Sequence, residues 1–171
     1  MAIELEGRAR VLGDDINTDY IIASTRKRDT LDEHVLKRYL LETIDPTFAA
    51  SVKPGDIIVA GSNFGCGSAM EIAVTVIQAA GISAVLARSF SRTFFRNAVN
   101  NGLVPLECET SGIVEGATVW VRASESDVVV EDKSRGLAIS ARPLPEMVGE
   151  ILKAGGLVEY IRLGHWDRSR V

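Results

Sequence analysis

Residues 56–87, DIIVAGSNFGCGSAMEIAVTVIQAAGISAVLA, determine the fold. They contain two short apolar runs, at 57–60 and 82–87, of the kind that strands show when both faces of a sheet are covered. Between these runs, apolar residues recur at helical spacing, and Gly81 follows as a residue suited to end a helix. The segment therefore predicts a strand, a helix and a second strand.

The same alternation continues along the chain. SRTFFRNAVNN at 91–101 predicts a second helix that ends at Gly102, and LVPLE at 103–107 predicts a third strand. Strands that alternate with helices pair in parallel through right-handed crossovers. We therefore expect an α/β fold built on a parallel βαβαβ core.

The flanking regions add further elements. IELEGRARVL at 3–12 alternates like a strand, and 117–142 predicts additional antiparallel strands, followed by a helix from Pro145 to about Ala154. No repeat or linker interrupts the chain, so one domain is expected over 1–171. A further helix is predicted over 31–43, with an apolar face made of Leu31, Val35, Tyr39 and Leu40.

Composition narrows the class of protein. The chain of 171 residues has a formal net charge of −4, which argues against nucleic acid as the main partner. The sequence MAIELEGRARVLG has no signal-peptide pattern, and no apolar run approaches the ~18 residues that a transmembrane helix needs. A cytoplasmic protein that does not bind membranes is expected.

Potential metal ligands are few. The chain has two cysteines, Cys66 and Cys108, whereas an iron–sulfur cluster usually needs three or four thiolates. Its two histidines, His34 and His165, have no metal-ligand spacing. No metal site is therefore predicted in this chain. Cys66 is interpreted as a small residue in a crowded turn, with a reactive thiolate near a helix start as the alternative.

The loop between the first buried strand and its helix carries the functional signal. Its glycines allow a ligand to approach the backbone, and N–H groups at a helix start suit a carboxylate or phosphate. Ser68 and Glu71 match a capping box, which predicts that Ser68 caps the helix. The alternatives are anion binding without chemistry, or a base in which the same N–H groups stabilise the Ser68 alkoxide. The loop lacks the lysine of a P-loop.

Three segments in the same order resemble the small subunits of 3-isopropylmalate dehydratase, which belong to the aconitase superfamily. They are GDDINTD (13–19), KPGDIIVAGSNFGCGS (53–68) and ISAVLARSFSRTFFRNAVNNGLVPLEC (82–108). The resemblance implies a swivelling β/β/α domain that acts only with a separate large subunit, which would carry a [4Fe–4S] cluster. The substrate would be a di- or tricarboxylic 2-hydroxy acid, isomerised by dehydration and rehydration.

The resemblance also implies roles for individual residues. Ser68 falls on the family's catalytic base, which removes a proton next to a carboxylate, and Asp19 falls on a residue that supports the site. The substrate-binding positions implied are Asp19, Arg26, Arg28, Gly65, Cys66, Gly67, Ala69 and Met70. Arg92 and Arg96 also resemble a family segment and are expected either to contact substrate or partner or to be solvated.

The sequence departs from the family at two places. The family usually reads G-x-G-S-S-R-E-H where this chain has GCGSAMEI at 65–72, so Met70 replaces an arginine that clamps a substrate carboxylate. In the loop at 23–30, expected to be mobile and to select the substrate, Arg26 and Lys27 stand where Tyr-Leu is common, and Arg28 falls on the family's arginine. We hypothesise that this basic loop supplies the charge absent at Met70. The alternatives are a solvated basic run on the surface and a divergent subunit with a different partner or weak activity.

Other functions fit the same residues. A related dehydratase, of homoaconitase type or acting on another substituted malate, is the first alternative to 3-isopropylmalate dehydratase. A non-catalytic subunit that binds an anion or regulates a partner is the second. A partner that supplies the cluster favours the enzyme, whereas tight binding of a small acid by the isolated chain favours the second alternative.

Overall fold

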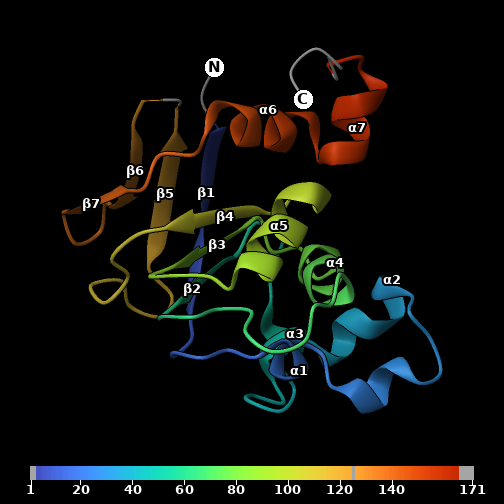
Figure 1. The fold of residues 1–171 in the computed structure, drawn as a ribbon. Coiled ribbons are helices and arrows are strands. Elements are labelled where there is room, and N and C mark those ends of the chain that lie inside the picture. The colour runs from blue at the N-terminus through green and yellow to red at the C-terminus, as the bar shows by residue number, and fades with distance from the viewer. Residues whose placement is uncertain (1–2, 125, 166–171) are drawn as a thin grey trace.

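The computed structural model describes residues 3–124 and 126–165 (Figure 1). Its strands are β1 (Ile3–Val11), β2 (Ile57–Ala60), β3 (Ala84–Ala87), β4 (Val104–Glu107), β5 (Thr118–Ala123), β6 (Val128–Asp132) and β7 (Leu137–Ala141). Its α-helices are α1 (Thr18–Ile21), α2 (Glu33–Leu36), α3 (Phe48–Ser51), α4 (Ile72–Ala79), α5 (Arg92–Asn101), α6 (Glu146–Ala154) and α7 (Leu157–Arg162). Two 3-10 helices, η1 (Ser24–Lys27) and η2 (Lys37–Tyr39), lie in the early part of the chain.

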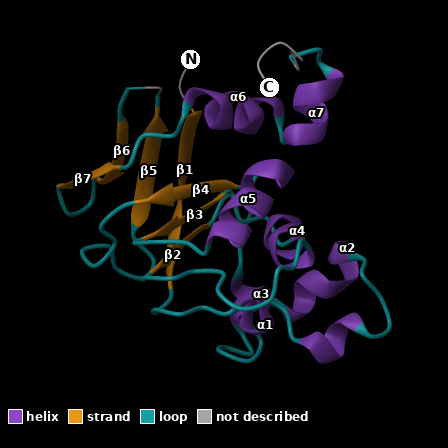
Figure 2. Cartoon of the chain, viewed as in Figure 1, coloured by secondary structure: helices purple, strands orange, loops and turns teal. Residues whose placement is uncertain are grey.

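The strands form one seven-stranded sheet in the order β4-β3-β2-β1-β5-β6-β7. β1 to β4 are parallel to one another, and β5, β6 and β7 continue the sheet as antiparallel strands. The first strand joins the two halves, since Ala9 to Val11 pair with β2 while Ile3 to Arg8 pair with β5. Figure 2 shows α1 to α5 on one side of the molecule and β5 to β7 extending away from them. The predicted parallel core with added antiparallel strands is confirmed.

The parallel half of the sheet is covered on both faces, which explains its uninterrupted apolar strands. Ile58 and Ala60 of β2 pack into a core with α4, α5 and the segment that follows β1. Ile57 and Val59 face a second core with residues of β5 and β6. In the antiparallel half, burial alternates along β5 and β6, as expected where one face is in contact with solvent.

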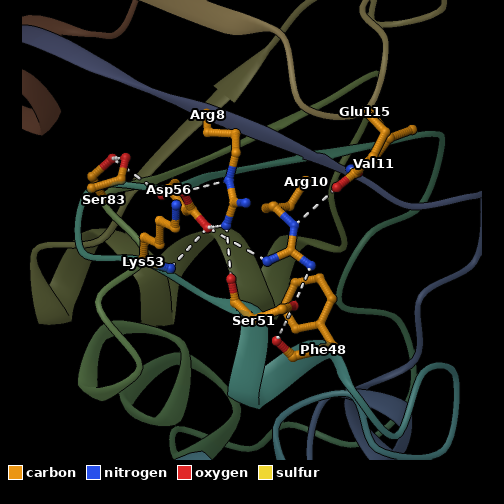
Figure 3. Close-up of polar contacts among 10 residues, drawn as sticks. Arg8, Arg10, Val11, Phe48, Ser51, Lys53, Asp56, Ser83 and Glu115 are labelled. Atoms are coloured by element: carbon orange, nitrogen blue, oxygen red, sulfur yellow. Dashed lines mark hydrogen bonds and ion pairs between the residues drawn. The ribbon is translucent and has the colours of Figure 1, made fainter.

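Two ion pairs that share the buried carboxylate of Asp56 connect β1 to the turn before β2; Arg10 is buried and Arg8 is half-buried (Figure 3). Arg8 Nη2 lies 2.6 Å from Asp56 Oδ2, and the Arg10 guanidinium lies 3.4 Å from the same oxygen. The backbone N–H of Lys53 also donates to this carboxylate. Burial alone would raise the pKa of Asp56, but the hydrogen bonds from Arg8 and Lys53 outweigh it and hold the pKa below its usual value. The pair fixes the strand that joins the two halves of the sheet.

The helix predicted over 31–43 is wrong in extent, and its predicted apolar face is buried only in part. The structure has α2 and η2 there, and Leu31 and Val35 are exposed. Leu40 of the predicted face is buried, and so are Leu36 and Leu41, which lie outside that face. The helical path ends at Leu40, whose backbone turns to ψ 121°, and the N–H of Leu41 donates to the Ile21 carbonyl instead of to a helical partner. Contact with the preceding segment overrides the local periodicity.

Candidate functional site

Three connections meet at the carboxyl ends of β1, β2 and β3, where open α/β sheets usually bind ligands. The glycine loop, residues 61–71, follows β2 and lies between the other two. Its Gly65 N–H donates to the Ile16 carbonyl over 2.8 Å, and its Phe64 N–H donates to the Ser89 carbonyl over 3.0 Å. Segments far apart in the sequence therefore hold this loop from both sides.

Close packing requires glycine at two positions of the loop. Gly65 has φ +75°, and a Cβ there would lie 2.2 Å from Cγ of Phe94 in α5. Gly67 has φ +91°, and a Cβ there would lie 2.5 Å from Oδ1 of Asn17. Both the backbone conformation and the available space exclude other side chains.

Ser68 is exposed and does not cap the helix. α4 begins at Ile72, and the residue at its N-cap position, Glu71, makes no capping hydrogen bond with its side chain. A capping residue normally contributes its carbonyl to the first helical hydrogen bond, but the Ser68 carbonyl accepts instead from Thr18 Oγ1 over 3.0 Å. The predicted capping box is therefore wrong, and the Ser68 hydroxyl has no hydrogen-bond partner among the described residues.

The backbone around this serine is rich in unused donors. Among residues 3–124 and 126–165, no hydrogen-bond partner is found for the N–H groups of residues 68 to 72. Unpaired N–H groups in an exposed turn before a helix attract anions, and they stabilise negative charge on an oxygen placed among them. The local arrangement is suited to a carboxylate ligand beside the Ser68 hydroxyl.

Asp19 lies next to this turn, as the sequence indicates. It belongs to the four-residue helix α1, whose first turn is capped by the side chain of Asn17. The hydroxyl of Ser24 donates to its carboxylate. Lys27 Nζ approaches the same oxygen, Asp19 Oδ1, to 3.7 Å. The start of the loop at 23–30 is thus attached to Asp19.

The three basic residues of the loop at 23–30 have different surroundings in the structure. The Arg26 guanidinium donates to both carboxylate oxygens of Glu42, at 2.7 and 3.0 Å, and lies 4.0 Å from the centroid of the Tyr39 ring. Arg28 is exposed and makes no hydrogen bond or ion pair with a described residue. The structure therefore does not bring Arg26 to the glycine loop as the sequence predicted. Lys27, which was not among the predicted site residues, contacts Met70 Sδ instead.

The remaining predicted site residues all belong to the glycine loop and differ in how exposed they are. Gly65 is buried, Cys66 and Met70 are half-buried, and Gly67 and Ala69 are exposed. Cys66 lies well before α4 begins, so a thiolate activated by a helix start has no structural basis. A groove of about 540 Å³ adjoins this turn, and both Lys27 and Met70 line it.

Arg92 and Arg96 line a different cavity, of about 600 Å³, together with Phe90 and Phe95. This cavity borders the segment that holds the glycine loop, because the Ser91 hydroxyl donates to the Gly65 carbonyl over 2.7 Å. It combines aromatic walls with cationic side chains. The prediction that these two arginines contact substrate or partner stays a prediction.

The described residues offer no site for a metal cluster. No group of three or more His, Cys, Asp or Glu side chains in this part of the chain could hold a metal ion. Cys108 is buried, and burial together with the neighbouring Glu109 raises its pKa to about 11, the opposite of what a thiolate ligand needs. Cys66 and Cys108 do not fit an iron–sulfur cluster. None of the described helices has the length and apolar character needed to cross a membrane.

Comparison with known proteins shows the family of this chain. The aconitase C-terminal domain family matches residues 15–111. A 3-isopropylmalate dehydratase small subunit from Halothermothrix orenii is 46% identical over 164 residues, covering 95% of this chain and 98% of the relative. A methanogen homoaconitase small subunit from Methanocaldococcus jannaschii is 42% identical over 158 residues, covering 92% of this chain and 91% of the relative.

A solved structure supports the same family assignment. The crystal structure of a 3-isopropylmalate dehydratase from Methanocaldococcus jannaschii is 40% identical and superimposes with a TM-score of 0.88, covering 98% of this chain and 99% of that one. This chain therefore belongs to the aconitase C-terminal domain family, in the group of dehydratase small subunits.

Proposed function

We propose that this chain, as one swivelling domain over residues 1–171, is the small subunit of a two-subunit hydro-lyase. It would act with a large subunit on 3-isopropylmalate, by removal and re-addition of water across adjacent carbons. The names of its relatives support the reaction class and the need for a large subunit. We place the [4Fe–4S] cluster in that large subunit, since the cysteines described here do not fit one. The cytoplasmic location expected from the sequence stays a prediction.

One observation carries the catalytic part of the proposal: the exposed Ser68 hydroxyl has no partner and lies in a turn of unpaired N–H groups. We assign Ser68 as the base. As the alkoxide, its oxygen takes the proton from the carbon next to a substrate carboxylate and becomes a neutral hydroxyl, and the electron pair of that C–H bond forms the alkene. The hydroxyl on the neighbouring carbon leaves as hydroxide with the C–O electron pair, and the cluster of the large subunit would act as the Lewis acid that accepts it. The N–H groups stabilise the alkoxide form of the serine before the proton is transferred. Re-addition of water reverses these steps with the carbons exchanged.

Replacing Ser68 with alanine in the reconstituted two-subunit enzyme tests this assignment. We expect kcat to fall by about 10²- to 10⁴-fold, the usual contribution of a positioned base, with association of the subunits unchanged. Ser62→Ala is the matched control, because Ser62 lies in the same loop and its hydroxyl makes no hydrogen bond with a described residue. A Ser68→Ala enzyme with wild-type kcat would exclude Ser68 as the base.

The substrate has a second candidate, because a homoaconitase small subunit is 42% identical to this chain. Measuring kcat/KM on alkyl-substituted malates and on tricarboxylic homologues distinguishes the two. A preference for the tricarboxylic acids would assign the chain to the homoaconitase type. If no acid is turned over although the isolated chain binds one tightly, the function is anion binding without chemistry.

A further inference from the structure

Lys27 is a positive charge without an adequate partner. Its side chain is only 13% exposed, although it belongs to a surface loop. Its ammonium contacts the Met70 sulfur, and Asp19 Oδ1 lies 3.7 Å away on a side chain that is 46% exposed. These are its only hydrogen-bond and ion-pair partners among residues 3–124 and 126–165.

Neither partner satisfies the ammonium. It carries three N–H donors, whereas a thioether is a weak and uncharged acceptor. The Asp19 oxygen already accepts from the Ser24 hydroxyl and lies at the long limit for an ion pair. A charge withdrawn from water requires a strong acceptor in compensation. The position of Lys27 therefore favours an additional anion.

The surroundings indicate what that anion is. Lys27 lies at the groove of about 540 Å³, whose apolar walls include Leu31, Met70 and Ile72. Glu33 and Glu71 also line the groove, but neither forms an ion pair with Lys27. Two carboxylates disfavour an occupant that is negatively charged throughout. The groove is suited to a molecule with a carboxylate at Lys27 and an uncharged side group against the apolar wall.

The contact between Lys27 and Met70 also relates two of the substitutions that depart from the family pattern. Where the family commonly has leucine and arginine, this chain has Lys27 and Met70. The two side chains touch, so a cation lies beside position 70 although residue 70 itself is uncharged. Arg26 and Arg28 do not take part, since Arg26 is bound to Glu42 and Arg28 is exposed without a hydrogen bond or ion pair to a described residue.

We propose that Lys27 binds a substrate carboxylate, in place of an arginine at position 70, and holds it beside the apolar wall of the groove. This inference rests on the proposed function and adds a binding residue to the same site.

Lys27→Leu in the reconstituted enzyme tests the inference. We expect the KM for the accepted acid to rise by about 10- to 100-fold, the usual effect of losing a charge-assisted hydrogen bond, with kcat changed much less. The double variant Lys27→Leu/Met70→Arg returns the cation to the other side chain and should recover most of this loss. Lys37→Leu, at an exposed lysine of η2 without a described partner, should leave KM unchanged. Thermal melts of the variant subunits establish that each one folds.

A binding measurement separates the test of Lys27 from the test of Ser68 as the base. Binding of the acid to the reconstituted Ser68→Ala enzyme, with and without Lys27→Leu, measures affinity without turnover. Unchanged affinity in the Lys27→Leu variant, or a double variant no better than the single one, overturns the role of Lys27 whatever Ser68 does. Conversely, weaker binding of the acid in the Lys27→Leu variant supports the role of Lys27 even if Ser68→Ala keeps wild-type kcat, a result that would exclude only the proposed base. If Lys27→Leu does not fold, Lys27→Met, which keeps the length of the side chain, gives the same comparison.

Discussion

The Thr18 hydroxyl donates a hydrogen bond to the Ser68 carbonyl oxygen over 3.0 Å. Thr18 is 2% exposed, and its backbone N–H donates to the Cys66 carbonyl in the same loop. One buried residue after β1 thus sets the path of the turn that carries the serine. Ser68 owes its position to this contact, since no helical hydrogen bond holds it.

Thr18→Val should therefore reduce turnover while leaving the fold intact. Valine keeps the shape of threonine but cannot donate to the Ser68 carbonyl. We expect kcat of the reconstituted enzyme to fall by about 10- to 100-fold, as small misplacements of reacting groups often do. Thr18→Ser keeps the hydroxyl and should retain most of the activity. Equal rates for Thr18→Val and the unmodified chain would show that this contact does not position Ser68.

Gly65→Ala should destabilise the protein more than an ordinary glycine substitution. The new methyl group would overlap the Phe94 ring at a backbone φ of +75°. We expect a loss of about 2–4 kcal/mol in the free energy of unfolding, measured by urea titration. Gly116→Ala is the matched control, because Gly116 has φ +79° but nothing within 4 Å of the added Cβ. Similar losses in the two variants would contradict the steric argument.

Asp56 should make the protein sensitive to acid. Its pKa is lowered in the folded state, so it stabilises the fold fully above the unfolded pKa, about 3.9. That stability is lost as the pH falls through the lower folded value. Asp56→Asn removes one partner of a buried ion pair and should cost about 3–5 kcal/mol at neutral pH.

The control for this prediction is Asp127→Asn, since Asp127 is exposed and its carboxylate makes no hydrogen bond with a described residue. Unfolding free energies measured from neutral to acid pH should show a shallower acid decline in Asp56→Asn than in the unmodified chain. Parallel curves for the two proteins would mean that another carboxylate causes the decline.

The two cysteines should differ in reactivity. The pKa of Cys108 is raised to about 11, so at pH 8 only about one thiol in a thousand is ionised, and the side chain is buried. Cys66 is half-buried within the glycine loop. We expect an alkylating agent to modify Cys66 first in the folded protein and both cysteines after unfolding, as peptide mass spectrometry would measure. Faster labelling of Cys108 in the folded state would contradict this environment.

The sequence is sufficient to predict a helix or strand wherever the interactions that form it are between residues close together in the chain. The strands at 57–60 and 84–87 follow from unbroken apolar runs, and α5 follows from Ser91 at its start and Gly102 at its end. The start of α4 could not be predicted in this way. Ser68 and Glu71 are spaced as a capping box, but a residue from another segment, Thr18, uses the carbonyl that the cap requires.

The candidate site shows the same division between local and distant interactions. The resemblance in GDDINTD and GCGS assigns Ser68 and Asp19 to one site, and in the structure both follow the carboxyl ends of neighbouring strands. It could not show which basic residue of the loop at 23–30 turns inward. That choice depends on Glu42 and Tyr39, which attract Arg26 and leave Lys27 to face Met70. Only the three-dimensional arrangement of separate segments contains this information.

β1 pairs with β2 at one end and with β5 at the other, and this arrangement has a consequence for synthesis on the ribosome. Its end near Val11 can pair with β2 soon after residue 60 is made, whereas Ile3 must wait for Ala123 to be translated. Until then the nascent chain presents an unpaired edge, which is prone to aggregate. The amino-terminal part of β1 therefore gains its strand partner only after Thr118–Ala123 have been translated.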